Sequence, residues 1–238
     1  MPPFLFIERG RFLMEANLIE SLGIYKFSSC LIKVPGVIPH LQYNDRIPLY
    51  DGEIYLYDLG GYTNDYYVGS VKVQVKASTL EDNFRYGFIF KVNDLIKYMN
   101  DGGVLILSAF VQHDHIVEMY YRPLLPFQLR ELIPKNMNQK SMRVKVFRLP
   151  KEGGIIRNEL SKFIYLSRRQ LSFIGKPLLS LDTVLQWIDY DYNVEINYHP
   201  MLSIKDKEKL IKKGATIYFQ PNDNSLQLPT NGKLFLCE

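Results

Sequence analysis

The chain has 238 residues, of which 47% are hydrophobic and 23% are charged, as is usual for a globular protein with a sizeable core. No stretch approaches the ~20 apolar residues of a membrane span, and the two cysteines form no CxxC pair or Cys/His cluster that would bind zinc. The net charge of +4 is compatible with a polyanionic partner but does not require one. The N-terminal apolar run lacks the flanking regions of a signal peptide, so we expect a soluble, cytoplasmic protein.

The N-terminal part predicts a helix followed by irregular chain. Residues 8–23 place apolar side chains on one helical stripe, and Gly23 is expected to end that helix. Three prolines within residues 31–50 favour irregular, extended chain.

Three strands are expected next, at residues 54–58, 70–77 and 86–92. Consecutive strands most economically form an antiparallel meander, so we expect these three to pair in chain order.

The rest of the first 171 residues adds further helices and strands. Asn93 can cap a helix that Gly102 and Gly103 end. The nearly continuous apolar run at 103–111 is typical of a strand buried on both faces of a sheet. Further expected elements are strands at 115–121 and 142–149, a short helix that Pro134 stops, and a helix at 156–170.

These elements predict a mixed α/β fold with a sheet against helices. The texture of the sequence changes near residue 172, where short apolar stretches surround a lysine-rich segment. We therefore expect a domain at residues 1–171 and a small α+β appendage at 172–238, within a chain that can itself be part of a longer protein.

Four polar residues could meet at one end of the expected sheet. Asp51 and Glu53 precede or begin one strand, and Gln74 and Lys76 lie on the next; residues two apart on a strand share a face. If the two strands pair antiparallel, the acidic pair lies beside the Gln/Lys pair. Carboxylate and amide oxygens suit Mg²⁺, and an ammonium beside them can orient a water or stabilise charge on a phosphate.

Plainer interpretations of the same residues stay open. The stretch VKVQVK at 71–76 alone is typical of an amphipathic strand with a solvated face. Asp51-Gly52 is also a common turn pair. Arg168 and Arg169 fit a solvated helix end favoured by the helix dipole as well as they fit a phosphate contact.

Together, these motifs resemble the PD-(D/E)xK phosphodiesterase superfamily, whose core runs α-β-β-β-α-β. The Gln-x-Lys form is similar to its Mrr-type branch. Over roughly residues 45–170, stretches such as YDGEIYLY and VKVQVKAS resemble a bacterial domain-of-unknown-function family. The resemblance implies a restriction-endonuclease-like fold, a central mixed sheet flanked by helices, and a DNA-cleaving module of an anti-phage or restriction-like system.

The resemblance also implies roles for individual residues. Asp51 or Glu53 would be the strand-head metal ligand, Gln74 a second ligand and Lys76 the catalytic lysine, with Mg²⁺ or Mn²⁺ as the cofactor. A glutamate of the first helix often joins such sites, and Glu15 is preferred here over Glu20.

DNA is the implied substrate, with a second defence protein or a homodimer as further partners. The candidate DNA contacts are Lys72, Ser78, Arg168 and Arg169.

Two departures from the family pattern weaken this interpretation. Position 50 is Tyr where relatives are expected to have Trp, and Gln74 is neutral where a carboxylate is usual. One fewer negative charge predicts weaker metal binding. A catalytically inactive nuclease-fold module that binds nucleic acid or a protein is therefore the alternative.

Overall fold

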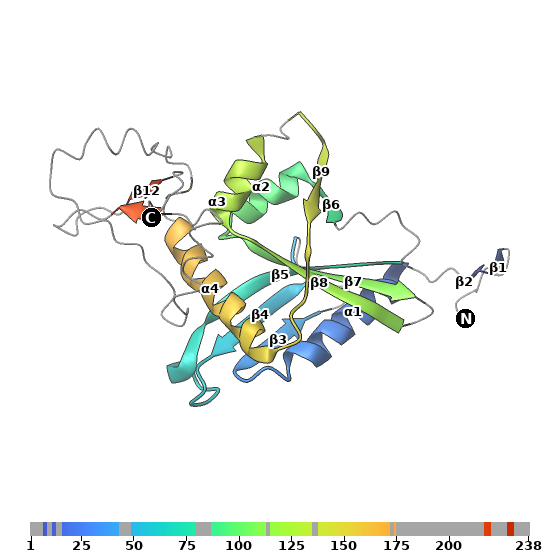
Figure 1. The fold of residues 1–238 in the computed structure, drawn as a ribbon, viewed down its shortest axis with the longest axis horizontal. Helices are drawn as coiled ribbons and strands as arrows, with labels where there is room; N and C mark the ends of the chain where they lie inside the picture. The colour runs from blue at the N-terminus through green and yellow to red at the C-terminus, as the bar shows by residue number, and fades with distance from the viewer. Residues whose placement is uncertain are drawn as a thin grey trace, which may run out of the picture. The chain divides into compact units, whose positions relative to one another are not determined.

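The computed structural model describes residues 7–8, 11–12, 16–42, 49–79, 87–112, 115–134, 138–171, 174, 217–219 and 228–230. The chain divides into two compact units, residues 1–174 and 175–238. In the second unit, strands β11 (Ile217–Phe219) and β12 (Leu228–Thr230) pair antiparallel. All other elements described below belong to the first unit, which is drawn from blue to orange in Figure 1.

A mixed six-stranded sheet forms the centre of the first unit, with strand order β10-β8-β7-β5-β4-β3. Only the β5–β7 pair is parallel. Its strands are β3 (Val37–Leu41), β4 (Gly52–Tyr57), β5 (Tyr67–Thr79), β7 (Val104–Gln112), β8 (His115–Leu124) and β10 (Phe147–Arg148).

Helices cover both faces of this sheet, and two small two-stranded sheets accompany it. Figure 1 shows α2 and α3 together, with one end of α4 next to α3 and α1 further away. The helices are α1 (Ala16–Leu31), α2 (Val92–Asn100), α3 (Pro126–Leu132) and α4 (Gly153–Leu171), and a 3-10 turn, η1, spans Asn64–Tyr66. The small sheets pair β1 (Ile7–Glu8) with β2 (Arg11–Phe12), and β6 (Gly87–Lys91) with β9 (Ser141–Lys145).

Successive side chains of β5 point to opposite faces of the central sheet. Val71, Val73 and Val75 are at most 1% exposed and pack in one cluster with α1 and α4. Lys72 and Gln74 point to the other face, which α2 and α3 cover in part through a second apolar cluster. The valines therefore anchor the strand, and the polar residues between them are held at fixed positions.

Two local expectations are wrong. Helix α1 begins at Ala16 and runs through Gly23 to Leu31, because Gly23 packs against the sheet: a Cβ on it would lie 3.2 Å from the Ala77 Cβ. The segment expected to be irregular contains β3, an edge strand, where a proline such as Pro39 is tolerated.

The expected meander is also different. The strand expected at 86–92 is β6, which pairs with β9 outside the central sheet, while β3 takes the first place of a β3-β4-β5 meander. With α1 before it and α2 and β7 after it, the order is helix, three antiparallel strands, helix and a parallel strand. This mixed α/β arrangement is compatible with a nuclease-like α+β fold.

Candidate functional site

Asp51 reaches from the head of β4 onto β5. Its Oδ2 accepts hydrogen bonds from the Gln74 Nε2 and from the Val75 backbone N–H, the latter at 2.6 Å. Its own backbone N–H donates to the Val73 carbonyl at 2.9 Å. The chain bends beside it at Gly52, where φ is +137° and a Cβ would lie 2.0 Å from the His40 carbonyl oxygen. Only glycine fits there, so Gly52 is needed to bring the Asp51 carboxylate to Gln74.

Gln74 is held by helix α2 as well. Its side chain is only 8% exposed, and its Oε1 accepts a hydrogen bond from the Tyr98 hydroxyl at 3.0 Å. The same hydroxyl lies 3.0 Å from the Leu49 carbonyl. Burial, followed by the charges of Asp94 and Asp51, raises the pKa of Tyr98, so it stays a neutral hydroxyl. The buried amide is thus oriented from both ends.

Lys72, two residues before Gln74 on the same face of β5, forms a cluster with two other side chains. Its Nζ lies 2.6 Å from the Asp101 Oδ2, which also accepts from the Tyr50 hydroxyl at 2.9 Å. The ammonium lies 5.2 Å from the centroid of the Tyr50 ring. Burial and the bond to Asp101 raise the pKa of Tyr50. This ion pair gives the Lys72 charge a carboxylate partner within the protein.

Lys76 and Glu53 flank the Asp51–Gln74 contact. Lys76 lies two residues beyond Gln74 on the same face, is partly exposed, and stands in register with Ser108 of β7. The Ser108 Oγ is buried and has no hydrogen-bond partner among the described residues. Glu53 stands in register with Lys72, and its charge, after burial, raises the pKa of Tyr55. One sheet face therefore carries all four residues that the sequence singles out.

The first-helix glutamates do not add to this group. Glu15 lies outside the described residues. Glu20 lies on α1, the helix that covers the opposite, valine face of β5. In the part of the chain that the structure describes, no three His, Cys, Asp or Glu side chains come together as a metal cluster.

Of the predicted DNA contacts, Lys72 and Ser78 lie on the same face of β5 as Gln74 and Lys76, whereas Arg168 and Arg169 lie on α4. Ser78 Oγ lies 3.3 Å from the Thr79 carbonyl, Arg168 donates to the Val68 carbonyl at 2.8 Å, and Arg169 donates to the Tyr165 hydroxyl. Helix α4, which carries both arginines, covers the valine face. Val68 and Lys76 are eight residues apart on an extended strand, a separation of about 27 Å.

Sequence reasoning missed Tyr98 and Asp101, which orient Gln74 and Lys72. Tyr98 continues the buried stripe of Val92 and Leu95 on α2. A tyrosine in such a stripe needs a partner for its hydroxyl, and that requirement is the signal that could have pointed to it. The sequence does not show which strand supplies this partner, because that depends on how α2 packs against the sheet.

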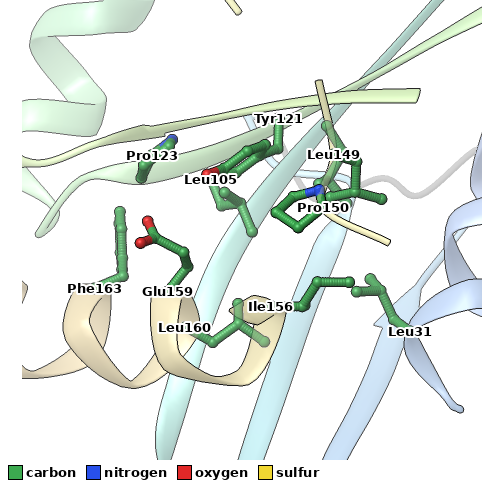
Figure 2. A pocket seen from close by; sticks show the side chains of 11 residues that line it. Leu31, Leu105, Tyr121, Pro123, Leu149, Pro150, Ile156, Glu159, Leu160 and Phe163 are labelled. Atoms are coloured by element: carbon green, nitrogen blue, oxygen red, sulfur yellow. The ribbon is translucent and has the colours of Figure 1, made fainter. Parts of the chain in front are cut away.

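A small apolar pocket lies on the opposite face of the sheet. Figure 2 shows its walls, formed by β7, β8, α1, α4 and the chain before α4, with side chains such as Leu105, Tyr121 and Phe163. Glu159 is the one carboxylate in its lining. Since Gln74 and Lys76 point to the other face, this pocket is separate from the polar site.

No protein-family model, curated protein or solved structure matches this chain. None of the helices in the described ranges is both long and apolar enough to cross a membrane.

Proposed function

We propose that residues 1–171 form a metal-dependent nuclease domain of the PD-(D/E)xK type, which hydrolyses phosphodiester bonds in DNA. The observation that carries the proposal is the Asp51–Gln74 contact at the head of β4, with Lys76 two residues further along the same face of β5. The order of α1, β3, β4, β5, α2 and β7 supports it, because it agrees with the core that the resemblance implies.

The donor set suits a hard cation with few protein ligands. Asp51 offers a carboxylate, Gln74 an amide oxygen, and Glu53 a second carboxylate on the same face; Mg²⁺ keeps several waters and tolerates so small a set. In the structure, the Gln74 Nε2 faces the Asp51 carboxylate. The two ends of an amide occupy nearly the same space, so their exchange puts the oxygen beside Asp51. The Tyr98 hydroxyl then accepts from the nitrogen and donates to the Leu49 carbonyl.

Each residue has a distinct part in this proposal. A metal held here would supply an activated water and would polarise the phosphate. Asp51 and Gln74 would hold the metal, with Glu53 beside them, and the Lys76 ammonium would orient the attacking water or stabilise negative charge on the phosphate. Glu15 remains a prediction for a further ligand.

The biological setting is proposed from the resemblance alone. A nuclease of this type would be the cytoplasmic effector of a bacterial anti-phage or restriction-like system. It would act with a second defence protein or as a homodimer.

One observation favours a second function. Asp51 and the buried Gln74 satisfy each other's hydrogen bonds, and Gln74 is also bonded by Tyr98, so the site is stable without a cation. A module that binds nucleic acid or a partner protein without cleavage would keep this arrangement.

Cleavage of supercoiled plasmid by the purified protein separates the two functions. The nuclease proposal expects nicking in Mg²⁺ that EDTA abolishes. It also expects Lys76→Ala to lose at least a hundredfold in rate, since electrostatic stabilisation of this kind is worth about 10²–10³. Lys151→Ala, at an exposed lysine before α4, is the matched control and should cleave normally. Mg²⁺-dependent cleavage that survives in Lys76→Ala would reject the assignment.

A further inference from the structure

A row of aromatic rings continues from the candidate site along the same face of the meander. We call it the aromatic strip. It comprises His40 of β3, Tyr55 and Tyr57 of β4, Tyr67 of β5, and Tyr62 of the loop between β4 and β5. On β4 the buried Ile54 and Leu56 point to the valine face, so Tyr55 points to the face of Glu53 and Lys72.

The rings touch one another in an unbroken series. Ring centroids lie 4.9 Å apart for His40–Tyr55, 6.1 Å for Tyr55–Tyr67, 5.6 Å for Tyr67–Tyr57 and 5.7 Å for Tyr57–Tyr62. The interplanar angles run from 53° to 80°, so no ring is stacked flat on its neighbour. Edge and tilted contacts fix the rings in place while leaving ring faces that are not used for mutual stacking.

Three of the five residues of the strip are exposed, and Tyr55 and Tyr57 are half-buried. Tyr62 is 61% exposed and Tyr67 is 42% exposed, and His40 is exposed as well. Tyr66, beside the strip, lies against Gly60 and Gly61 and is also exposed. Cross-strand pairing accounts for sheet stabilisation by Tyr57 and Tyr67, which stand opposite each other. Cross-strand pairing does not explain why Tyr62, which lies in the loop, adds a further exposed ring to the series.

Charges of both signs surround the strip, because Glu53 lies beside Tyr55 and Asp65 lies in η1. Asp58, at the end of β4, is paired with the Arg157 guanidinium at 3.4 Å, and Asp101 is paired with Lys72 at 2.6 Å. Lys72 and Lys76 lie on the same face of β5 beyond Tyr67. A ligand that stacks on the strip and continues along β5 therefore passes Lys72, which is paired with Asp101, and then reaches the Lys76 ammonium.

We propose that the aromatic strip binds an unpaired nucleic-acid strand by stacking its bases on the exposed tyrosine and histidine rings. Every base has a π face, so such binding tolerates any sequence, and a duplex, whose bases are already stacked, gains little from it. The delivery of the strand to Asp51, Gln74 and Lys76 rests on the proposed function; the binding itself does not.

The test is fluorescence anisotropy of a labelled oligothymidylate, at low salt and in EDTA so that nothing is cleaved. The wild-type chain should bind the single strand more tightly than a duplex of equal length. Tyr62→Ala and Tyr67→Ala should each weaken binding by about 5- to 150-fold, the loss expected per stacked base. Tyr67→Phe, which keeps the ring, should bind like the wild type.

Tyr25→Ala is the matched control, because Tyr25 is 72% exposed on α1, away from the strip. Urea unfolding of each variant checks that the fold is retained. Unchanged binding in folded Tyr62→Ala and Tyr67→Ala, an equal loss in Tyr25→Ala, or a preference for duplex would overturn the proposal. If binding depends on the rings but no Mg²⁺-dependent cleavage occurs, the aromatic strip is supported and the nuclease proposal is rejected. If cleavage occurs but binding does not depend on the rings, the nuclease proposal is supported and the aromatic strip is rejected.

Discussion

Asp51 and Gln74 are 23 positions apart in the chain, yet the carboxylate of one accepts a hydrogen bond from the amide of the other across the β4–β5 pair. The contact depends on the Gly52 bend and on the antiparallel register that sets Gly52 opposite Val73. At this contact the Asp51 carboxylate lies beside the Gln74 amide, and Lys76 follows Gln74 by two residues on the same face of β5.

Removing the Tyr98 hydroxyl should destabilise the fold. Tyr98→Phe leaves the buried Gln74 Oε1 without its donor, which costs about 1–3 kcal/mol of unfolding free energy. Urea unfolding measures this loss. Tyr62→Phe removes a hydroxyl from an exposed ring and should change stability little; equal effects of the two substitutions would contradict the role given to Tyr98.

Freeing Lys72 from Asp101 should strengthen nucleic-acid binding. The ion pair is partly exposed, so Asp101→Asn should alter stability by less than about 1 kcal/mol. The unpaired ammonium can then reach a phosphate, and affinity for an oligonucleotide in EDTA should rise, with the gain fading as salt is added. Glu131→Gln removes the same charge from an exposed site on α3; an equal gain there would show only a net-charge effect.

Stability should depend on pH through Glu118. The hydrogen bond from the Tyr120 hydroxyl at 2.5 Å, and then the Arg148 guanidinium at 2.5 Å, lower the pKa of Glu118 below its usual range. A carboxyl whose folded pKa is lowered stabilises the protein above its unfolded pKa, about 4.3, and loses that contribution as pH falls through the folded value.

The measurement for Glu118 is urea unfolding of wild type and Glu118→Gln at neutral and acidic pH. The wild type should be the more stable at pH 7, and the difference should shrink below the ordinary glutamate range. A difference that stays constant with pH would show that the charge of Glu118 is not what stabilises the fold.

The local pattern of β5 carried most of what the sequence could predict about the site. Alternation in VKVQVK requires Gln74 and Lys76 to share a face, and antiparallel pairing brings the head of β4 to it. The mixed α/β class likewise follows from periodicity. These are short-range consequences of side-chain spacing, which a sequence displays directly.

What the sequence could not predict depends on packing over long range. The sequence predicts a helix end at Gly23, but Gly23 lies inside α1, where the sheet comes close to the helix. The strand at 87–91 pairs with 141–145 rather than with β5. Tyr98 on α2 and Asp101 just after it become partners of Gln74 and Lys72 because of how that helix docks on the sheet. Glu15, the preferred helix ligand, lies outside the described residues.

The central claim is that Asp51 and Gln74 form a cation site, and Gln74→Glu tests it most directly. This substitution sets a second carboxylate against Asp51 in a buried position, where like charges repel unless a cation lies between them. Without metal the variant should therefore be less stable than the wild type. Binding of Mg²⁺ to the folded state alone should restore its stability.

The measurement is the midpoint of thermal unfolding as Mg²⁺ is titrated into wild type, Gln74→Glu and the control Gln128→Glu, which changes an exposed glutamine at the start of α3. The account predicts a midpoint that rises with Mg²⁺ in all three proteins, which share Asp51, and most steeply for Gln74→Glu. A Mg²⁺ dependence that is the same in all three proteins would contradict a metal site at Asp51 and Gln74.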